Sequence, residues 1–222
     1  MNVSVIIPVL NEEQTIRTLL QELQSCRQQG HELIVVDGGS SDKTMLVARE
    51  LSDKVISVNK GRATQMNAGA AQAKNEILWF LHSDTKISGE EIKIIQSALK
   101  DKVWGRFNIK LSGTNVLFRV IETMINIRSC ITGIATGDQG IFVKRDIFES
   151  LNGYADIPLM EDIDLSKKLK TITRPLCLND VIVTSSRRWE NKGIIATVLL
   201  MWRLRFLYWL GVSPVTLAEH YR

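Results

Sequence analysis

A histidine and a carboxylate two residues apart, His82 and Asp84, follow a run of five apolar residues, Ile77–Leu81. Such a run is typical of a strand buried on both faces of a parallel sheet. In open α/β sheets ligands bind beyond the carboxyl ends of such strands, and alternation along the extended chain puts both side chains on one side. Together they could hold a divalent cation, Mn²⁺ or Mg²⁺, that binds a diphosphate. The structural alternative is a Ser-Asp-Thr turn that caps the next helix.

Carboxylates also stand at the end of another predicted strand and at the start of a predicted helix. Asp37 ends an apolar run and precedes two glycines, so it could accept hydrogen bonds from a nucleotide base or ribose, or could be a solvated turn residue. Glu161 and Asp162 open a helix, where the macrodipole favours acids. If that helix start faces the edge that carries His82, a carboxylate there could act as a general base; otherwise the acids only cap the helix.

Three arginines could bind phosphate oxygens. Arg62 begins a helix rich in small residues, and its planar guanidinium suits phosphate or ribose, although an exposed arginine at a helix start is equally consistent. Arg187 and Arg188 stand beside Trp189 and could bind a diphosphate, or could be a surface basic pair.

Strands and helices alternate through the first half of the chain. Strands are predicted at 3–10, 32–37, 54–58 and 77–81, and helices at 11–26, 43–51, 61–71 and 89–99. Asn11 is the predicted N-cap of the first helix. This alternation predicts right-handed βαβ units and an α/β fold with a mostly parallel, Rossmann-like sheet flanked by helices.

The second half of the chain is less regular. Residues 104–111 alternate apolar and polar side chains, which predicts an edge or half-exposed strand. A helix at 114–130, a glycine-punctuated loop at 132–140, a strand at 141–145 and a helix at 146–151 follow. After the helix that starts at Glu161, two short strands are predicted at 175–178 and 181–184.

Composition narrows the function classes. The chain has 222 residues and a net charge of +4, which suits one α/β domain with a short appendage and anionic substrates or membrane surfaces, but is too small for a nucleic-acid-binding protein. Cys26, Cys130 and Cys177 are widely spaced, so neither a zinc site nor a disulfide is predicted. Without a signal-peptide pattern, we expect a reducing, cytoplasmic setting.

A nearly all-apolar segment spans residues 194–212 and includes Trp202 and Trp209. Arg203 and Arg205 interrupt it, at roughly 2.5–3.5 kcal/mol each on insertion scales, so a simple membrane span is not expected. We expect a helix that lies at a membrane interface, packs on the domain or forms a dimer contact. Residues 1–190 would then be the domain and 191–222 the tail, with the protein cytoplasmic or peripheral on the inner face of the plasma membrane.

Five segments together carry a resemblance to a known family. They are Val5–Glu12, Val35–Asp37 with Gly39–Asp42, Phe80–Asp84, Gly137–Gly140 and Glu161-Asp162. In order and spacing they resemble family 2 glycosyltransferases with the GT-A fold, over about residues 3–190. The segments Gly61–Asn67 and Ser186–Trp189 are most similar to those of a small, single-domain bacterial subgroup.

The resemblance implies an inverting transfer of a sugar from a UDP- or GDP-sugar to an acceptor hydroxyl, with a lipid-like acceptor suggested by the apolar tail. Asp37 would bind the base, Asp84 would match the last Asp of the family's DXD metal motif, and Asp162, beside Glu161, would be the base. Gly137–Gln139 would shape the side of the acceptor and the sugar. The donor-binding residues expected in all are Pro8, Asn11, Glu12, Asp37, Asp42, Arg62, Asn67, Asp138, Gln139, Arg187, Arg188 and Trp189.

Two positions depart from the family pattern. His82 replaces the first Asp of DXD, so the imidazole is a candidate second metal ligand. Ser185 replaces the Gln of the Gln-x-x-Arg-Trp motif of processive members, so polymer synthesis is not expected. The His82 departure also motivates an alternative, a non-catalytic scaffold or regulator at the membrane that binds sugar nucleotides. Dehydrogenase and P-loop functions are disfavoured because GxGxxG after the first strand and GxxxxGK[ST] are both absent.

Overall fold

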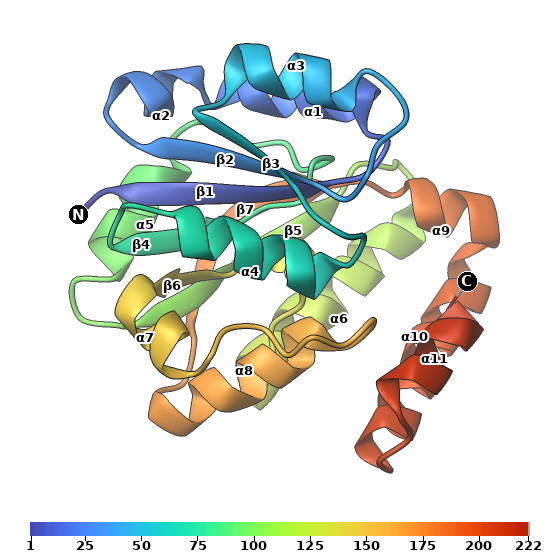
Figure 1. The fold of residues 1–222 in the computed structure, drawn as a ribbon. Coiled ribbons are helices and arrows are strands. Elements are labelled where there is room, and N and C mark those ends of the chain that lie inside the picture. Colours follow the sequence, from blue (N-terminus) through green and yellow to red (C-terminus); the bar gives the residue numbers. More distant parts are fainter. Residues whose placement is uncertain (222) are drawn as a thin grey trace.

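Seven strands form one twisted sheet in the order β3-β2-β1-β4-β6-β5-β7 (Figure 1). The structure is a computed structural model that describes residues 1–221. The strands are β1 (Val3–Val9), β2 (Glu32–Asp37), β3 (Lys54–Ser57), β4 (Ile77–Phe80), β5 (Trp104–Leu111), β6 (Phe142–Lys144) and β7 (Leu176–Thr184). β6 is antiparallel to both of its neighbours, and the other neighbouring pairs are parallel. The predicted mostly parallel α/β sheet is therefore confirmed.

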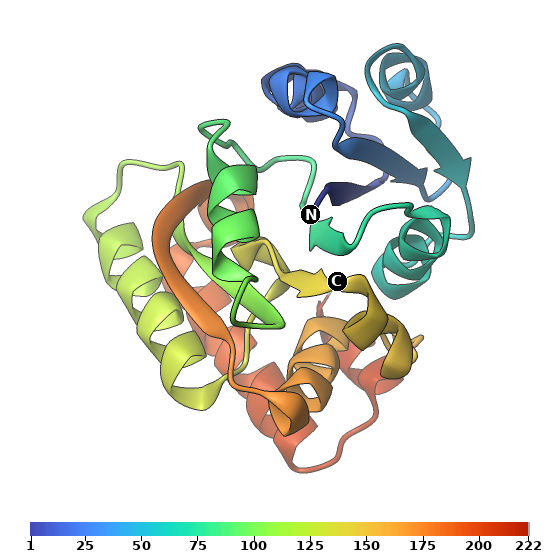
Figure 2. The ribbon, with the colours of Figure 1, turned by 90° about the vertical axis from the view of Figure 1, so that its left-hand side faces the viewer.

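Helices cover both faces of this sheet (Figure 2). The α-helices of residues 1–221 are α1 (Glu13–Glu22), α2 (Gln24–Gln28), α3 (Thr44–Leu51), α4 (Arg62–Gln72), α5 (Glu91–Ala98), α6 (Val116–Thr132), α7 (Arg145–Ser150), α8 (Glu161–Ile172), α9 (Arg187–Lys192), α10 (Ile194–Trp209) and α11 (Pro214–Tyr221). A short 3₁₀ helix, η1 (Gly137–Gln139), precedes β6.

The core has two layers, one on each face of the sheet. On one face α1, α3 and α5 pack on the strands through residues such as Leu20, Val47 and Ile95. On the other face α4, α7 and α8 pack through Met66, Phe148 and Leu169. Because alternate residues of each strand point to opposite faces, the apolar runs of β1, β2 and β4 supply side chains to both layers.

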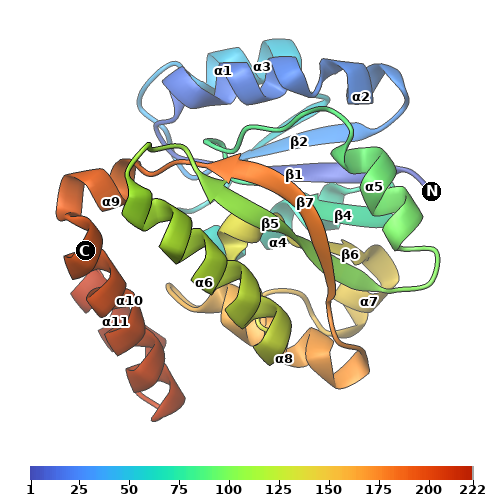
Figure 3. The same cartoon turned by 180° about the vertical axis from the view of Figure 1, so that it is seen from behind.

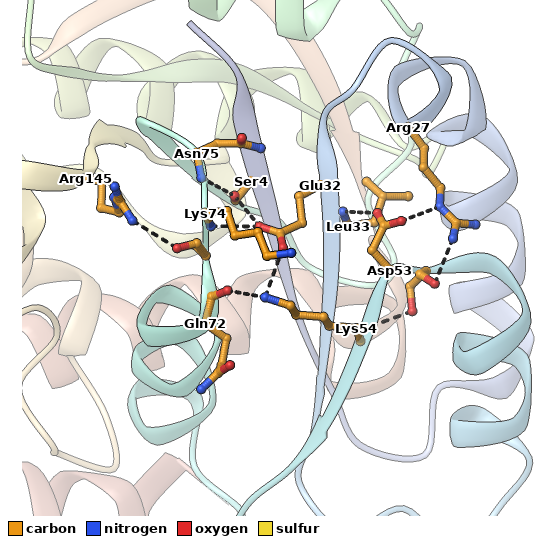
Figure 4. Close-up of polar contacts among 12 residues, drawn as sticks. Ser4, Arg27, Glu32, Leu33, Asp53, Lys54, Gln72, Lys74, Asn75 and Arg145 are labelled. Atoms are coloured by element: carbon orange, nitrogen blue, oxygen red, sulfur yellow. Dashed lines mark hydrogen bonds and ion pairs between the residues drawn. The ribbon is translucent and has the colours of Figure 1, made fainter.

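A polar network joins the amino ends of the first three strands (Figure 4). The buried Glu32 accepts hydrogen bonds from the Ser4 hydroxyl (2.8 Å) and the Lys74 backbone N–H (2.9 Å), and pairs with Lys54 at 3.1 Å. Asp53 in turn pairs with Arg27 at 2.7 Å. These charges are satisfied within the scaffold, which leaves the opposite, carboxyl edge of the sheet for ligands.

Several local predictions are wrong. Asn11 is not the N-cap: it has a left-handed φ of 55°, and α1 starts at Glu13. The two strands predicted at 175–178 and 181–184 are the single strand β7, which pairs with β5 across a register irregularity. β5 is consequently not at the edge, and its Arg106 is buried. Strand partners are long-range choices that local alternation does not encode.

Cys130 and Cys177 are paired as a disulfide, with their Cα atoms 5.9 Å apart, which corrects the expectation of no disulfide. The pair joins the last turn of α6 to the start of β7, segments that are 47 residues apart in sequence. Spacing along the chain could not reveal this pairing because the contact depends on how α6 packs on β5 and β7. Cys26 is free and buried.

The apolar segment after residue 193 forms two helices, α10 and α11, that pack side by side (Figures 1 and 3). Leu204 of α10 and Leu217 of α11 are buried together with Met160 and Ile163, which flank the Glu161-Asp162 pair. Of the helices within residues 1–221, none combines the length and hydropathy that a membrane-crossing segment needs.

Candidate active site

The carboxyl ends of β1, β2 and β4 lie at one edge of the sheet, and the loops that follow them meet there. The β4 tip carries His82, which packs directly on the backbone of the η1 segment: a Cβ added at Gly137 would lie 2.9 Å from His82 Nε2. The Gly137 N–H donates a hydrogen bond to Asp162 Oδ2 at 2.9 Å. The structure thus brings together His82 and Asp162, which are 80 positions apart in the printed sequence.

The α8 start holds two acids of different character. Asp162 is oriented by two backbone donors, since its other oxygen accepts from the Ile163 N–H at 2.7 Å. Glu161 is buried, and burial together with the neighbouring Asp162 charge raises the pKa of Glu161 to about 7, against the opposing charge of Arg62. One of the two carboxyls is therefore fixed by hydrogen bonds, while the other is poised to bind a proton near neutral pH.

Arg62, the first residue of α4, supplies positive charge to this group of acids. Removal from water lowers the pKa of Arg62, but the charges of Tyr221, Glu161, Asp162 and Asp84 outweigh this and raise it. The guanidinium is therefore fully charged, at the centre of the predicted site. Burial, together with the Arg62 charge, lowers the pKa of His82 to about 3. His82 is consequently neutral, the form in which an imidazole nitrogen can bind a metal.

Asp84 follows His82 and lies among charges from three other segments. Burial and the Glu12 carboxylate raise the pKa of Asp84, while Arg187 and Arg62 lower it. Glu12 also pairs with Arg187 at 3.5 Å, which links the loop after β1 to the helix after β7. The loop after β4 therefore carries a carboxylate with a second acid and two arginines around it.

Asp37, at the end of β2, presents an unused acceptor. Its Oδ2 accepts hydrogen bonds from the backbone N–H groups of Gly39 (2.9 Å) and Ser40 (3.0 Å), which form the turn after the strand. Its Oδ1 is buried without a hydrogen-bond partner among residues 1–221. Buried carboxylate oxygens are normally paired, so this atom is suited to receive a donor from a bound ligand.

Residues 4–146, more than half of the chain, match the family described as Glycosyl transferase family 2. The chain belongs to glycosyl transferase family 2. It is 25% identical to the probable glycosyltransferase YdaM of Bacillus subtilis, over 97% of this chain and 56% of the relative. It is 32% identical to the undecaprenyl-phosphate 4-deoxy-4-formamido-L-arabinose transferase of Photorhabdus laumondii, over 67% of this chain and 51% of that protein. The chain thus spans about half the length of these curated relatives.

Solved structures agree on the fold of this family 2 glycosyltransferase. The mannosyltransferase PcManGT of Pyrobaculum calidifontis, in complex with GDP-Man and Mn²⁺, has a TM-score of 0.67 at 20% identity, over 92% of this chain and 60% of that one. Residues 1–349 of TarS from S. aureus, in complex with UDP-GlcNAc, have a TM-score of 0.63 at 21% identity, over 83% and 58% of the two chains. At these identities the likeness concerns the fold, and it confirms the predicted GT-A architecture.

The chemistry of the residues present fits the divalent cation that such a family implies. Among residues 1–221 no three His, Cys, Asp or Glu side chains cluster closely enough to form a metal site by themselves. In phosphate sites, however, Mg²⁺ is usually held by one or two carboxylates plus substrate phosphates. Asp84, with Glu12 and the neutral His82 nearby, offers such an incomplete donor set. The site therefore suits a cation that arrives with a diphosphate.

Three other predicted donor-binding residues have their polar atoms occupied within the scaffold. Asp42 accepts hydrogen bonds from the backbone N–H groups at the starts of α3 and α1. Asn67 exchanges two hydrogen bonds with the backbone of Tyr154, at 2.8 and 2.9 Å. Gln139 is fully buried, caps η1 through Thr136 and donates to the Ser129 hydroxyl.

Three further predicted donor-binding residues lie in two places: two at the carboxyl edge of the sheet and one in an apolar cluster. Pro8, at the register of Val36, and Asn11, which accepts a hydrogen bond from the Ser41 N–H at 2.9 Å, line the exit of β1 beside the Asp37 turn. Trp189 packs in an apolar cluster between α6 and α10, away from this turn.

Arg188 has a partner that the sequence did not indicate. Its Nη2 donates to the Tyr221 carbonyl at 2.9 Å, and its guanidinium carbon lies 3.6 Å from the centre of the Tyr221 ring. The Nε of Arg188 is buried and unpartnered within the described chain. A tyrosine near the end of the sequence, outside every motif, gave no signal that α11 returns to the site.

Asp138 and two arginines extend the charged region below Asp162. Asp138 Oδ1 and Arg128 Nη2 are both buried without a hydrogen-bond partner in residues 1–221. Burial raises the pKa of Asp138, as does the Asp162 charge, while its hydrogen bond with Thr136 and the Arg205 and Arg128 charges lower it. Neither Arg128 nor Arg205 was predicted to be a site residue, because both stand in helices without a motif, and Arg205 was noted only as an interruption of the apolar segment.

Proposed function

We propose that this protein is an inverting glycosyltransferase that moves a sugar from a nucleoside-diphosphate sugar to an acceptor hydroxyl. The observation that carries the proposal is the contact of three segments at the carboxyl edge: His82 against Gly137, and Gly137 hydrogen-bonded to Asp162. This contact supports the proposal because a transfer between two bound substrates requires the base, here Asp162, to be close to the diphosphate site, here the tip of β4.

The donor would lie along the ends of β2, β4 and β7. Asp37 Oδ1, which has no partner in residues 1–221, would accept a hydrogen bond from the base, uracil or guanine. Arg62 and Arg187 would attract the diphosphate oxygens, since both charges act on Asp84. Asp84, with His82 beside it, would hold Mn²⁺ or Mg²⁺, which supplies charge neutralisation of the leaving nucleoside diphosphate.

Asp162 would remove the proton of the acceptor hydroxyl. The acceptor oxygen forms a bond to the anomeric carbon as the bond from that carbon to the diphosphate oxygen breaks. The proton goes to Asp162, and the electron pair leaves with the nucleoside diphosphate. Attack from the face opposite the diphosphate inverts the anomeric configuration. The two backbone hydrogen bonds to Asp162 keep the carboxylate oriented during this step.

The acceptor in this proposal is lipid-like, and the protein acts at the surface of the plasma membrane. Two observations support this. A relative that is 32% identical bears the name of an undecaprenyl-phosphate transferase. The outer side of α10 exposes large apolar side chains, among them Trp202, Phe206 and Trp209.

Calorimetric titration with UDP and with GDP, each with and without Mn²⁺, tests the donor site. We expect one nucleotide to bind in a Mn²⁺-dependent manner. If neither binds, the proposed transferase is wrong; if binding is independent of Mn²⁺, the metal assignment to Asp84 is wrong.

Asp162→Asn separates an enzyme from a scaffold that only binds sugar nucleotides. The variant should keep nucleotide affinity and lose between about 100-fold and 10,000-fold in release of nucleoside diphosphate from the donor sugar, since a general base contributes that much. Asp164→Asn is the matched control, because Asp164 lies in the same helix turn and pairs with Lys168. Unchanged release in Asp162→Asn would contradict its role as the base.

A further inference from the structure

Two helices of the protein expose continuous apolar stripes to solvent. Each stripe follows helical spacing, and its side chains are between 46% and 77% exposed. The residues are Val116, Leu117, Val120, Met124, Ile127 and Ile131 on α6, and Ile195, Leu199, Trp202, Phe206, Trp209 and Leu210 on α10. We call these twelve side chains the apolar face. Contiguous apolar surface of this extent marks an interaction site.

The two stripes belong to one surface because α6 and α10 are parallel neighbours. Ile194 and Val198 of α10 pack with Phe118 and Ile121 of α6. Figure 3 shows the two helices slanting in the same direction next to each other. Each residue turns the helix by about 100°. Going round α6 in the direction of the chain, the side that contacts α10 comes after the exposed stripe, whereas on α10 the side that contacts α6 comes before it. Both stripes therefore turn to the same side.

Arginines line the seam between the two stripes. Arg128 stands two turns after Ile121 and Arg205 two turns after Val198, so both lie on the contact flanks. Burial and the Arg205 charge lower the pKa of Arg128 to about 10, against the acids Asp138 and Asp162. Neither arginine forms an ion pair within 4.0 Å among the described residues, and Arg128 Nη2 is unpartnered.

The apolar face carries positive charge and no accessible acid. α10 contains no Asp or Glu, and the one acid of α6, Glu122, is buried and pairs with Arg119 at 3.0 Å. Arg203 is exposed on the outer flank of the α10 stripe. Two tryptophans among the exposed residues add side chains that favour the boundary between water and lipid.

We propose that the apolar face lies on the surface of an anionic lipid bilayer, with α6 and α10 parallel to its plane, and that Arg128 and Arg205 in the seam bind the phosphate of a lipid beside Asp162. Because this takes the acceptor hydroxyl of the proposed transferase to be the P–OH group of a lipid monophosphate, whose proton would go to Asp162, it rests on that proposed function. The seam connects the bilayer to the candidate base, so a lipid phosphate held there would reach Asp162 without leaving the membrane surface.

A second copy of the chain fits this face less well than a bilayer. A two-fold dimer places the same surface against itself. Such contact would bring Arg203, Arg205 and Arg128 toward their own copies without an acid on the face to compensate. An anionic bilayer instead complements these charges, with a contribution of about 1 kcal/mol per basic residue near the surface.

Flotation with vesicles tests the apolar face. We expect the protein to float with vesicles of phosphatidylcholine and phosphatidylglycerol, less with phosphatidylcholine alone, and less at high salt. Leu199→Glu should lower the bound fraction about tenfold or more. Leu46→Glu on α3 is the matched control, because Leu46 and Leu199 are both 58% exposed helical leucines. Absence of the wild type from floating vesicles, or dimerisation that Leu199→Glu abolishes, would overturn the docking surface.

Titration with farnesyl phosphate, farnesol and inorganic phosphate tests the seam. We expect farnesyl phosphate to bind at least about tenfold more tightly than either other probe, and Arg205→Gln to remove the preference over farnesol. Equal binding of inorganic phosphate would identify a free anion site, and equal binding of farnesol would identify an apolar site only; either result contradicts the proposal. UDP or GDP titration of the same variant should be unchanged. If the wild type binds neither UDP nor GDP, that result would instead count against the proposed transferase itself.

Discussion

The two oxygens of Asp37 have different surroundings, and this difference determines what a substitution will do. One oxygen accepts two backbone hydrogen bonds of the turn, and the other is buried and unpaired within the described chain. In Asp37→Asn the amide oxygen can still accept the two backbone hydrogen bonds of the turn. The NH₂ group, a donor, then takes the place of the unpaired acceptor Oδ1. We expect the affinity for UDP or GDP to fall between about fivefold and 150-fold, from the roughly 1–3 kcal/mol of an unmade hydrogen bond.

Calorimetry checks this expectation, with Asp101→Asn at an exposed turn as the control. Equal nucleotide affinity in Asp37→Asn and wild type would mean that the unpaired oxygen does not contact the base.

Glu161 makes stability depend on pH. Its pKa rises from 4.5 to about 7 on folding because it is buried and lies beside Asp162. Between these values the folded state binds more protons than the unfolded state, so the free energy of unfolding decreases as pH rises from about 4.5 to 7. The stabilisation, of order 3 kcal/mol by this linkage, is present below pH 4.5 and lost above 7.

Urea unfolding at pH 5 and pH 8 measures this dependence. Glu161→Gln should reduce the difference between the two pH values, while Glu149→Gln, whose side chain is 63% exposed, should leave it as in wild type. Identical pH dependence in Glu161→Gln and wild type would show that another group is responsible.

For single residues, the sequence predicted the location of the candidate site better than it predicted what each residue does there. His82, Asp84 and Asp162 were selected because each stands at the end of a strand or the start of a helix, and the structure brings all three to one edge. Asn67 was selected as a polar group in the first turns of a helix and Gln139 from the family resemblance, but their amides hold neighbouring backbone and side chains. A polar residue in a loop can serve either purpose, and only its partners distinguish the two. The site assignments themselves stay predictions.

At the level of elements, the disulfide between α6 and β7 constrains the unfolded chain. Closing a loop of 47 residues stabilises the folded state by about 4 kcal/mol in the chain-entropy model. We expect Cys177→Ser to lower the free energy of unfolding by about this amount in oxidised protein, as measured by urea titration.

The comparison with reduced wild type makes this test specific. Reductant should bring the wild type down to the stability of Cys177→Ser and leave the variant unchanged. A wild type that is insensitive to reductant would contradict the pairing.

The positions of helices and strands were predicted well where local periodicity determines them. They were predicted poorly where the pairing of distant strands determines them. The bounds of β5 agree with the predicted strand at 104–111, yet β5 is covered by β7 rather than exposed at the edge. Residues 179–180 separate two apolar runs in the sequence, but β7 continues through them. Partners that are distant along the chain hold these residues extended, and a window of neighbouring residues carries no information about them.

For the molecule as a whole, the carboxyl-terminal helices are not independent of the candidate site. Leu204 is fully buried in a cluster with Met160 and Ile163, on either side of Glu161-Asp162. The apolar contacts thus cross the boundary predicted at residue 190, and whether 191–222 is a separate unit stays a prediction. We expect Leu204→Ala to cost about 2–4 kcal/mol of stability.

Hydrogen exchange locates this effect. In Leu204→Ala, protection should fall in α10, α11 and the first turn of α8. Leu199→Ala, in the same helix but on the exposed side, should leave protection as in wild type. If exchange increases in α10 and α11 alone, the helices do not support the start of α8.

The contact between Tyr221 and Arg188 decides where a purification tag can be placed. A tag added after residue 222 would follow α11, whose Tyr221 ring lies on the Arg188 guanidinium and whose charge acts on Arg62. A hexahistidine tag there would bring imidazoles within reach of the Mn²⁺ added in a donor assay and would compete for it. The amino terminus leaves from the opposite edge of the sheet, where the Asn2 N–H bonds to Glu76 (Figure 1). A tag at that end keeps the metal for the donor.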